Sequence, residues 1–236
     1  MNYRLLPFLF LFLSSFKPVT VKVNSDPKAL AASAKSSLEL KVKNLYGSLN
    51  LNSFTMPKME AFSKGVEGYL QLKEQGVIQK DVLTIVDFSL SSTQKRLWVI
   101  DMLTNTVLLQ SVVSHGRNSG EEFATSFSNE SNSYKSSLGF YTTGETYNGK
   151  HGLSLKLDGL ESGINSNARN RAVVMHGADY AAESIIKQQG RLGRSQGCPA
   201  VPYAIHKEII NLIKNKSCLF IYHPSRTYEK QSKLIS

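Results

Sequence analysis

From Asp81 onward the chain is a series of short apolar, β-branched runs, each ended by glycine, asparagine or another polar residue. Runs of this length and composition predict β-strands, because helices need longer segments with apolar residues three or four positions apart. The polar LTNT stretch between the second and third run predicts a hairpin turn. We therefore expect a mainly β, mostly antiparallel domain over residues 81–225. The predicted strands lie in VLTIVDF, RLWVIDM, VLLQSVVSH, LGFYTTGETY, HGLSLKLDGL, RAVVMHG and CLFIYH.

Helices are expected at the flanks of this domain, which makes the predicted class α+β. Thr55 and Pro57 can begin a helix, and Gly76 can end it. Between them apolar residues recur at helical spacing: Met59, Phe62, Val66, Tyr69 and Leu70. With a weaker helix near 35–47, residues 26–80 are predicted to be a linker and helical extension.

Two more helices are predicted inside the domain, one near 180–188 and one beginning after Pro202. The chain then ends in a Lys/Ser-rich segment, residues 226–236. Terminal segments of this composition are commonly poorly ordered, so we expect a loose tail.

The N-terminus has the pattern of a secretory signal. Arg4 precedes an apolar run from Leu5 to Phe16 that carries no charge. The run matches a signal-peptide core and is too short for a membrane span, which needs about 20 residues. We predict a signal peptide over residues 1–25 and export to the periplasm or cell envelope. The alternative interpretation is a buried core strand.

Charge and composition narrow the partners. Hydrophobic residues make up 41% and charged residues 19% of the chain, as in an ordinary globular protein. The formal net charge of +10 suits nucleic acid, an anionic envelope polymer or an anionic membrane surface. The sequence contains no compact Lys/Arg run with interleaved aromatic residues, so we do not expect nucleic acid as a partner.

The two cysteines raise three possibilities: a disulfide, a metal site and a nucleophile. In an exported protein, Cys198 and Cys218 would ordinarily suggest a disulfide. However, Cys218 opens an apolar run and is typical of a buried small hydrophobe. Cys198 instead lies in a tight turn between Gly197 and Pro199, where backbone N–H groups can approach a bound atom. The helix expected after this turn could also favour a thiolate.

A thiol nucleophile needs a base, and His176 is the strongest candidate. It ends the run RAVVM, is followed by Gly177 and lies 22 positions before Cys198 (198 − 176 = 22). A zinc site remains the alternative, with His115, His151, His176 and Cys198 as ligands. None of these four residues forms a close-spaced pair such as HxxxH or CxxC, so we expect no metal.

Together these residues resemble the L,D-transpeptidase catalytic domain, the YkuD-like family, and more closely its murein L,D-transpeptidase branch. The family pattern of His-Gly followed by Ser/Thr-x-Gly-Cys is matched by His176-Gly177 and by Ser195-Gln196-Gly197-Cys198. The similarity extends from about Leu83 to His223. The resemblance implies a YkuD-like β-sandwich or barrel with an N-terminal helical extension.

The resemblance also implies a two-step acyl transfer on peptidoglycan peptide stems, with no cofactor. Cys198 would attack the carbonyl after the third residue of a tetrapeptide stem, and an amine of another stem would take the thioester. His176 would be the base, and the Gly177 carbonyl would hold its second nitrogen. Backbone N–H groups around Gly197 and Cys198 would form the oxyanion hole.

Four further residues are expected at the substrate or behind the site: Ser195, Arg194, His115 and Tyr141. Two positions depart from the family pattern. Gln196 stands where many members have His, and Ala200 stands where many have Arg. Arg194, directly before the motif, is a candidate for the missing positive charge.

Two other functions stay open at this point. Hydrolysis of the same thioester would make the protein an L,D-carboxypeptidase, and the sequence does not separate the two reactions. A non-catalytic envelope-binding module would instead carry a Cys198–Cys218 disulfide.

Overall fold

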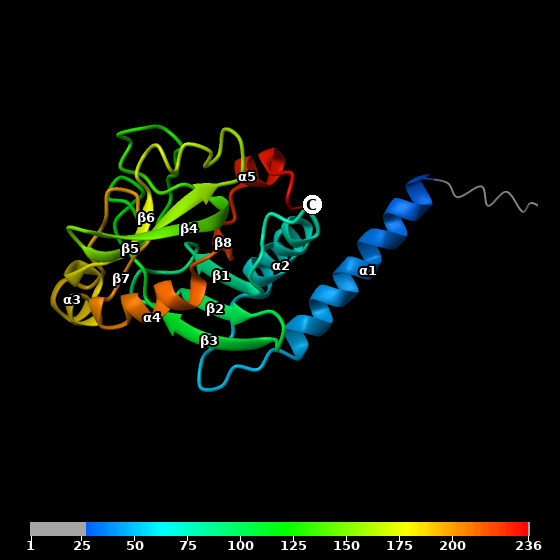
Figure 1. The fold of residues 1–236 in the computed structure, drawn as a ribbon, viewed down its shortest axis with the longest axis horizontal. Coiled ribbons are helices and arrows are strands. Elements are labelled where there is room, and N and C mark those ends of the chain that lie inside the picture. Colours follow the sequence, from blue (N-terminus) through cyan, green and yellow to red (C-terminus); the bar gives the residue numbers. More distant parts are fainter. Residues whose placement is uncertain (1–26, 236) are drawn as a thin grey trace, which may run out of the picture. The chain divides into compact units, whose positions relative to one another are not determined.

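The computed structural model describes residues 27–235 and contains one eight-stranded sheet (Figure 1). The strands lie side by side in the order β3-β2-β1-β8-β4-β5-β6-β7. Their bounds are β1 Val82–Asp87, β2 Leu97–Asp101, β3 Thr106–Ser111, β4 Gly139–Gly149, β5 Gly152–Gly159, β6 Val174–Gly177, β7 Ala200–Val201 and β8 Cys218–Tyr222. Each of the seven predicted runs contributes a strand, and β7 was not predicted.

The sheet is mixed and curls until it is nearly a barrel. β1 runs parallel to β8 and β6 parallel to β7, whereas the other neighbouring pairs are antiparallel. The chain beyond β3 reaches the opposite end of the sheet, where the Ser114 N–H donates to the Ala200 carbonyl at 2.8 Å. This contact brings the two ends of the strand order together beside the Ser-x-Gly-Cys turn.

The helices cover the sheet as the α+β prediction expects. α2 (Met59–Glu74) packs on β1 and β8 with one apolar face, and Ala61, Phe62, Val66, Tyr69 and Leu72 are buried. α4 (Tyr203–Ile213) buries Ile209, Ile210 and Ile213 in the same core. Between β6 and β7 lie the 3-10 turn η1 (Asp179–Ala181) and α3 (Glu183–Gln189), close to the helix predicted near 180–188.

The N-terminal part contains α1 (Pro27–Gly47), a longer helix than the one expected near 35–47. The chain divides into two units between Ser37 and Leu38. In the second unit Val42 joins the buried core, so the end of α1 belongs to the folded domain. The predicted signal peptide, residues 1–25, lies outside the described residues. No helix among the described residues is both long and apolar enough to cross a bilayer.

The C-terminal tail differs from the loose segment that its composition predicts. Residues Arg226–Gln231 form α5, and the side chain of Tyr228 is buried. Its hydroxyl donates to a carboxylate oxygen of Glu161 at 3.1 Å, and Ser232 contacts the other oxygen of the same carboxylate. A buried carboxylate needs such donors, because leaving it without hydrogen bonds is costly. These contacts hold the tail against the domain, and their donors lie too far along the chain for composition to reveal them.

Candidate active site

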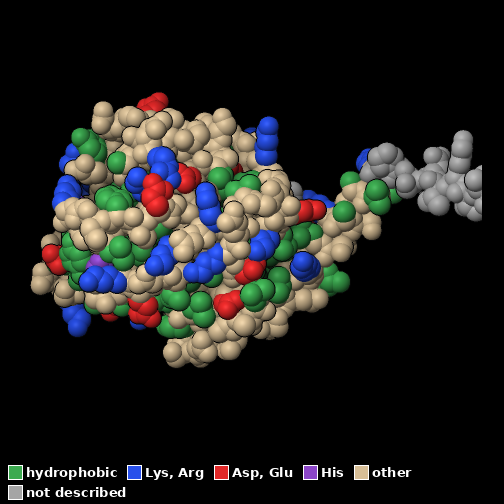
Figure 2. Space-filling view, in the orientation of Figure 1, with side chains coloured by type: hydrophobic (Ala, Val, Ile, Leu, Met, Phe, Trp, Pro, Cys, Tyr) green, Lys and Arg blue, Asp and Glu red, His purple; other side chains and the backbone are tan. Residues whose placement is uncertain are grey.

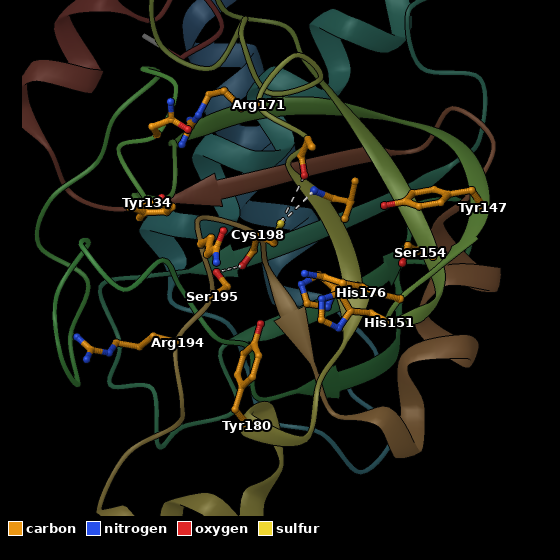
Figure 3. Close-up of a pocket in the computed structure, with 16 residues that line it drawn as sticks. Tyr134, Tyr147, His151, Ser154, Arg171, His176, Tyr180, Arg194, Ser195 and Cys198 are labelled. Atoms are coloured by element: carbon orange, nitrogen blue, oxygen red, sulfur yellow. Dashed lines mark hydrogen bonds between the residues drawn. The ribbon is translucent and has the colours of Figure 1, made fainter.

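A cavity of about 460 Å³ opens where the Ser-x-Gly-Cys turn meets β6 and the β4–β5 hairpin (Figure 3). Both Cys198 and His176 line it. Its lining contains three cations, three tyrosines and two histidines, and no acidic residue. The lining residues are Asn132, Tyr134, Tyr147, Gly149, Lys150, His151, Ser154, Arg171, Ala172, Val174, His176, Tyr180, Arg194, Ser195, Gln196 and Cys198.

Strand register places the thiol and the imidazole on neighbouring chain segments. β6 and β7 are parallel, with His176 opposite Ala200. Cys198 lies two residues before Ala200, and Val174 lies two residues before His176, so Cys198 falls beside Val174. The Val174 N–H accordingly points at the Cys198 sulfur, at 3.5 Å. Because residues two apart on a strand share a face, His176 and Cys198 are presented to the same cavity.

In this structure the thiol faces the backbone. Cys198 Sγ accepts from the Val174 N–H and donates to the Ala172 carbonyl at 3.7 Å (Figure 3). Within the described chain Sγ makes no hydrogen bond to His176. Catalytic hydrogen bonds are often long or poorly aligned before a substrate binds, so this geometry is compatible with a Cys–His pair.

His176 is held in one orientation. Its Nδ1 lies 2.9 Å from the Gly177 carbonyl, so Nδ1 carries the hydrogen and Nε2 is left to accept a proton. Gly177 has to be glycine, because a Cβ there would lie 2.5 Å from the Tyr203 ring and 2.8 Å from the His206 ring. The His151 ring stacks on the His176 ring with 4.3 Å between centroids and 22° between planes.

Burial shifts the pKa values of both partners toward their uncharged forms. The pKa of the Cys198 thiol is raised by burial, although the Val174 N–H, Arg171 and Lys150 partly offset this. The pKa of His176 is lowered by burial, and the charges of His151, Lys150 and His206 lower it further. Both shifts favour the neutral thiol and the neutral imidazole over the ion pair. The pair has to transfer a proton when it reacts.

The turn before the nucleophile is fixed by Ser195. The Ser195 hydroxyl donates to the Cys198 carbonyl at 2.6 Å and accepts from the Gly197 N–H at 3.0 Å. Gly197 has a φ of +123°, a backbone conformation that L side chains rarely adopt. The Gly197 N–H is thus already used, which corrects its predicted place in the oxyanion hole. The Cys198 N–H donates no hydrogen bond within the described residues and remains available.

His115 lies behind this turn and does not line the cavity. Its carbonyl accepts from the Ser195 N–H at 2.9 Å. Its Nδ1 accepts from the guanidinium of Arg96 at 2.8 Å, and Nε2 lies 3.3 Å from the Gly120 carbonyl. His115 is 1% exposed and so supports the turn, which rules out the substrate-wall half of the prediction.

Arg194 and Tyr141 have different outcomes. Arg194 lines the cavity, but its guanidinium is paired with Glu121 and donates to the carbonyls of Arg117 and Gly120. Tyr141 is fully buried, and its hydroxyl donates to the Ser137 carbonyl at 2.9 Å. The predicted substrate contact at Tyr141 is therefore wrong, and the residue packs in the core.

Sequence reasoning missed several residues of this cavity, among them Arg171, Lys150 and the role of His151. Arg171 lies close enough to act electrostatically on the thiol, and it donates to the carbonyls of Ser128 and Lys135. His151 had been considered only as a zinc ligand. An Arg–Asn–Arg stretch in a loop carries no signal for the site; only the His-Gly pair at 151–152, shared with His176, hinted at it.

The metal and disulfide alternatives do not match the geometry. Among residues 27–235 no group of three or more His, Cys, Asp or Glu side chains could hold a metal ion. Cys198 and Cys218 are both free thiols, and Cys218 is buried in β8. The cavity can therefore supply a thiol, a neutral base and a positively charged lining for an acyl group.

The cavity thus holds a thiol and an imidazole beside the end strands of a mixed eight-stranded sheet. The family model for the L,D-transpeptidase catalytic domain matches residues 55–222, which is most of the chain. The chain belongs to this family. The matched segment begins ahead of α2, so it includes a helix that the sequence analysis assigned to the extension.

Solved structures with similar folds include several L,D-transpeptidases. One from Mycobacterium smegmatis is 12% identical, with 61% of this chain and 59% of that chain covered and a TM-score of 0.38. One from Stackebrandtia nassauensis is 11% identical, with 79% and 76% covered and a TM-score of 0.37. One from Mycobacterium tuberculosis H37Rv is 13% identical, with 61% and 58% covered and a TM-score of 0.37. The chain spans about three-fifths of the length of the first of these. No curated protein matches the chain significantly.

Proposed function

We propose that the protein is a peptidoglycan L,D-transpeptidase that uses Cys198 as its nucleophile. The observation that carries the proposal is the strand register that presents Cys198 and His176 to one cavity in a chain of this family. We further propose that it acts in the cell envelope, where its polymer substrate lies.

In the first half-reaction the thiol of Cys198 rotates toward His176 and gives its proton to Nε2. The sulfur attacks the carbonyl after the third residue of a donor tetrapeptide stem. The tetrahedral intermediate then expels the amine of the terminal D-residue, which takes the proton back from Nε2. The products are a thioester at Cys198, a free D-amino acid and a neutral imidazole.

The structure offers a donor for the charge that develops on the carbonyl oxygen. The Cys198 N–H has no partner within the described chain, and Ser195 holds the turn that carries it. An oxyanion donor of this kind typically contributes about 2.7–4 kcal/mol to the transition state. Because the Gly197 N–H is bound to Ser195, we assign this donor role to Cys198 alone.

The lining of the cavity suits the charge of the substrate. Lys150, Arg171 and Arg194 face it, and no acidic side chain does. On the face shown in Figure 2 the basic side chains are spread among acidic ones instead of forming one continuous patch. A stem peptide bears carboxylates, so the cations that line the cavity can attract it.

Intact-mass spectrometry after incubation with a tetrapeptide stem tests the proposal. We expect the wild-type protein to gain the mass of the tripeptidyl group. A carbapenem should add to the same sulfur, because its β-lactam carbonyl is an electrophile for the same nucleophile. Cys198→Ser and His176→Ala should each abolish the adduct.

The matched control is Cys218→Ala, which removes the other thiol and should still form the adduct. Circular dichroism would show that each variant keeps its fold. An adduct on Cys198→Ser, or none on the wild-type protein with either probe, would overturn the proposed function.

A further inference from the structure

The inference concerns His151 and rests on the proposed function. The His151 ring lies in the turn between β4 and β5 and stacks on His176 at 4.3 Å between centroids (Figure 3). His176 is 3% exposed, whereas His151 is only half-buried. Neither ring nitrogen of His151 makes a hydrogen bond within the described chain. The cavity thus contains a second imidazole with both nitrogens available and access to water.

The second half-reaction has one proton more than His176 alone can handle. The acceptor is a side-chain amine, which is an ammonium ion near neutral pH because its pKa is about 10.4. In balanced form, the thioester and the ammonium R–NH3⁺ give an amide R–NH–CO, the free thiol and one proton. Of the three ammonium protons, one stays on the amide nitrogen, one returns to sulfur and the third has to leave.

His176 can carry only one of the two protons that move. Its Nδ1–H is donated to the Gly177 carbonyl, so Nε2 is its single basic position. In aminolysis Nε2 takes a proton from the attacking nitrogen and passes it to the leaving sulfur. The ammonium must already have lost its first proton, because a nitrogen without a lone pair does not attack the thioester.

We propose that His151 is the base that removes this first proton from the acceptor ammonium and releases it to solvent. The amine then attacks the thioester with its free electron pair, and the C–S bond breaks as the C–N bond forms. His151 would thus be a catalytic residue of the second half-reaction only. The site would take a cationic primary amine as acceptor.

The surroundings of His151 fit this role. Burial lowers the pKa of His151, and the neighbouring Lys150 lowers it further, so both effects favour the neutral, proton-accepting ring. His176 stacks on it, and one protonated ring disfavours a proton on the other. Protonated His151 therefore has to pass its proton to water before His176 becomes charged, and its partial exposure allows that transfer.

Hydrolysis of the same thioester makes no such demand. Water attacks as a neutral molecule; one of its protons reaches sulfur through His176, and the other stays on the carboxylic acid until it ionises. Loss of His151 should therefore change the balance between cross-linking and trimming. At about pH 8.5, well above the lowered pKa of His176, it should leave formation of the thioester unaffected. This contrast separates a base from a residue that merely orients His176.

The test uses His151→Phe, which keeps an aromatic ring against His176 and removes the base. Acyl-enzyme is formed from a tetrapeptide, and its decay at about pH 8.5 is followed with two acceptors. One is a lysine-type side-chain amine with a pKa of about 10.4, and the other is the α-amine of an amino-acid amide with a pKa of about 8. At this pH the first is mostly ammonium and the second mostly neutral.

We expect the rate of aminolysis by the side-chain amine to fall by about tenfold or more. This threshold lies below the roughly 10²–10⁴-fold that a general base usually contributes. Acylation, hydrolysis and aminolysis by the α-amine should stay within about twofold of the wild-type rates. A residue that merely positions His176 would slow all of these reactions together. His223→Phe is the matched control: it replaces a histidine outside the cavity, against Phe127, and should change none of the four rates.

Three results would overturn the inference. Equal losses with both amines, or slower acylation in His151→Phe, would show that His151 supports His176 and does not serve the acceptor. Unchanged aminolysis with the side-chain amine would show that water takes the proton without help. Failure of the wild-type protein to form any acyl-enzyme would instead contradict the proposed function, so the two failures are distinguishable.

Discussion

The residues behind Cys198 and the residues in front of it use their polar groups in opposite ways. Behind it, Arg96 is fully buried and donates to the carbonyls of Leu90 and Val113 and to His115. In front, Lys150 and His151 line the cavity and make no side-chain hydrogen bond within the described residues. The rear holds the turn by using its donors, whereas Lys150 and His151 in front leave theirs available to a ligand.

Arg96 is unusual for a buried arginine because none of its hydrogen bonds in the described chain goes to a carboxylate. Its guanidinium stacks on the Phe88 ring, with 4.8 Å to the centroid, and burial lowers the pKa of Arg96 to about 9. Since a buried charge is costly, such a residue persists only where its donors satisfy several buried acceptors. Two of these acceptors, the Val113 carbonyl and the His115 Nδ1, belong to the segment whose His115 carbonyl accepts from the Ser195 N–H.

The largest expected effect comes from breaking the rear. Arg96→Met leaves two buried carbonyls and the His115 Nδ1 without their donor, which should lower the free energy of unfolding by about 3–5 kcal/mol. Urea denaturation followed by circular dichroism measures it. Lys95→Met is the control, because the neighbouring side chain is about half exposed and should cost less than about 0.5 kcal/mol. A loss in Arg96→Met as small as that in Lys95→Met would show that the rear network contributes no measurable stability.

Acid should break the rear next. Burial and the charge of Arg96 lower the pKa of His115 to about 4, so the folded state resists protonation of this ring. A group whose pKa is lower when folded contributes stability that is fully present above its unfolded pKa of about 6.5. That stability is lost as the pH falls from about 6.5 toward 4, by up to about 3 kcal/mol.

Urea midpoints measured across this pH range test the point. The wild-type protein should lose stability steadily on acidification, and His115→Gln should show a shallower slope because its side chain does not titrate. Equal slopes in the two proteins would place the acid sensitivity elsewhere.

The same contrast explains which features of the fold and the site could be predicted from the sequence. The strands and the pair His176 and Cys198 followed from local patterns, because periodicity and the His-Gly and Ser-x-Gly-Cys motifs are written in consecutive residues. Tyr141 was misplaced because its strand, β4, is buried on both faces at that point, so alternation gave no inside and outside. Five neighbouring positions of β4 are all buried, beginning at Gly139.

Residues whose role depends on the fold were harder to find. Arg171 belongs to a loop, and His151 reaches His176 only because β5 pairs with β6. Arg96 reads as a surface charge in the segment QKRLW, and its burial depends on the chain beyond β3 folding over it. Long-range pairing of this kind leaves no trace in a single sequence.

The smallest expected effect comes from the front and concerns pH alone. The groups acting on His176 are His151, Lys150 and His206, and Lys150 and Arg171 act on the thiol. Lys150 lowers the pKa of both reacting groups, so Lys150→Met should raise both values. The rate of acylation by a carbapenem should then begin to fall at a higher pH on the acid side than in the wild-type protein.

Lys150→Arg should restore the wild-type profile, and Lys187→Met, which removes an exposed charge from α3 outside the cavity, should leave it unchanged. The urea midpoint of Lys150→Met should equal that of the wild-type protein, because the side chain holds nothing together. A stable variant with an unmoved acid limb would mean that solvent screens Lys150 from the thiol and imidazole. A destabilised variant would mean that the front, like the rear, is part of the scaffold. Only a shifted pH profile with an unchanged urea midpoint is consistent with Lys150 acting on the reaction and not on stability.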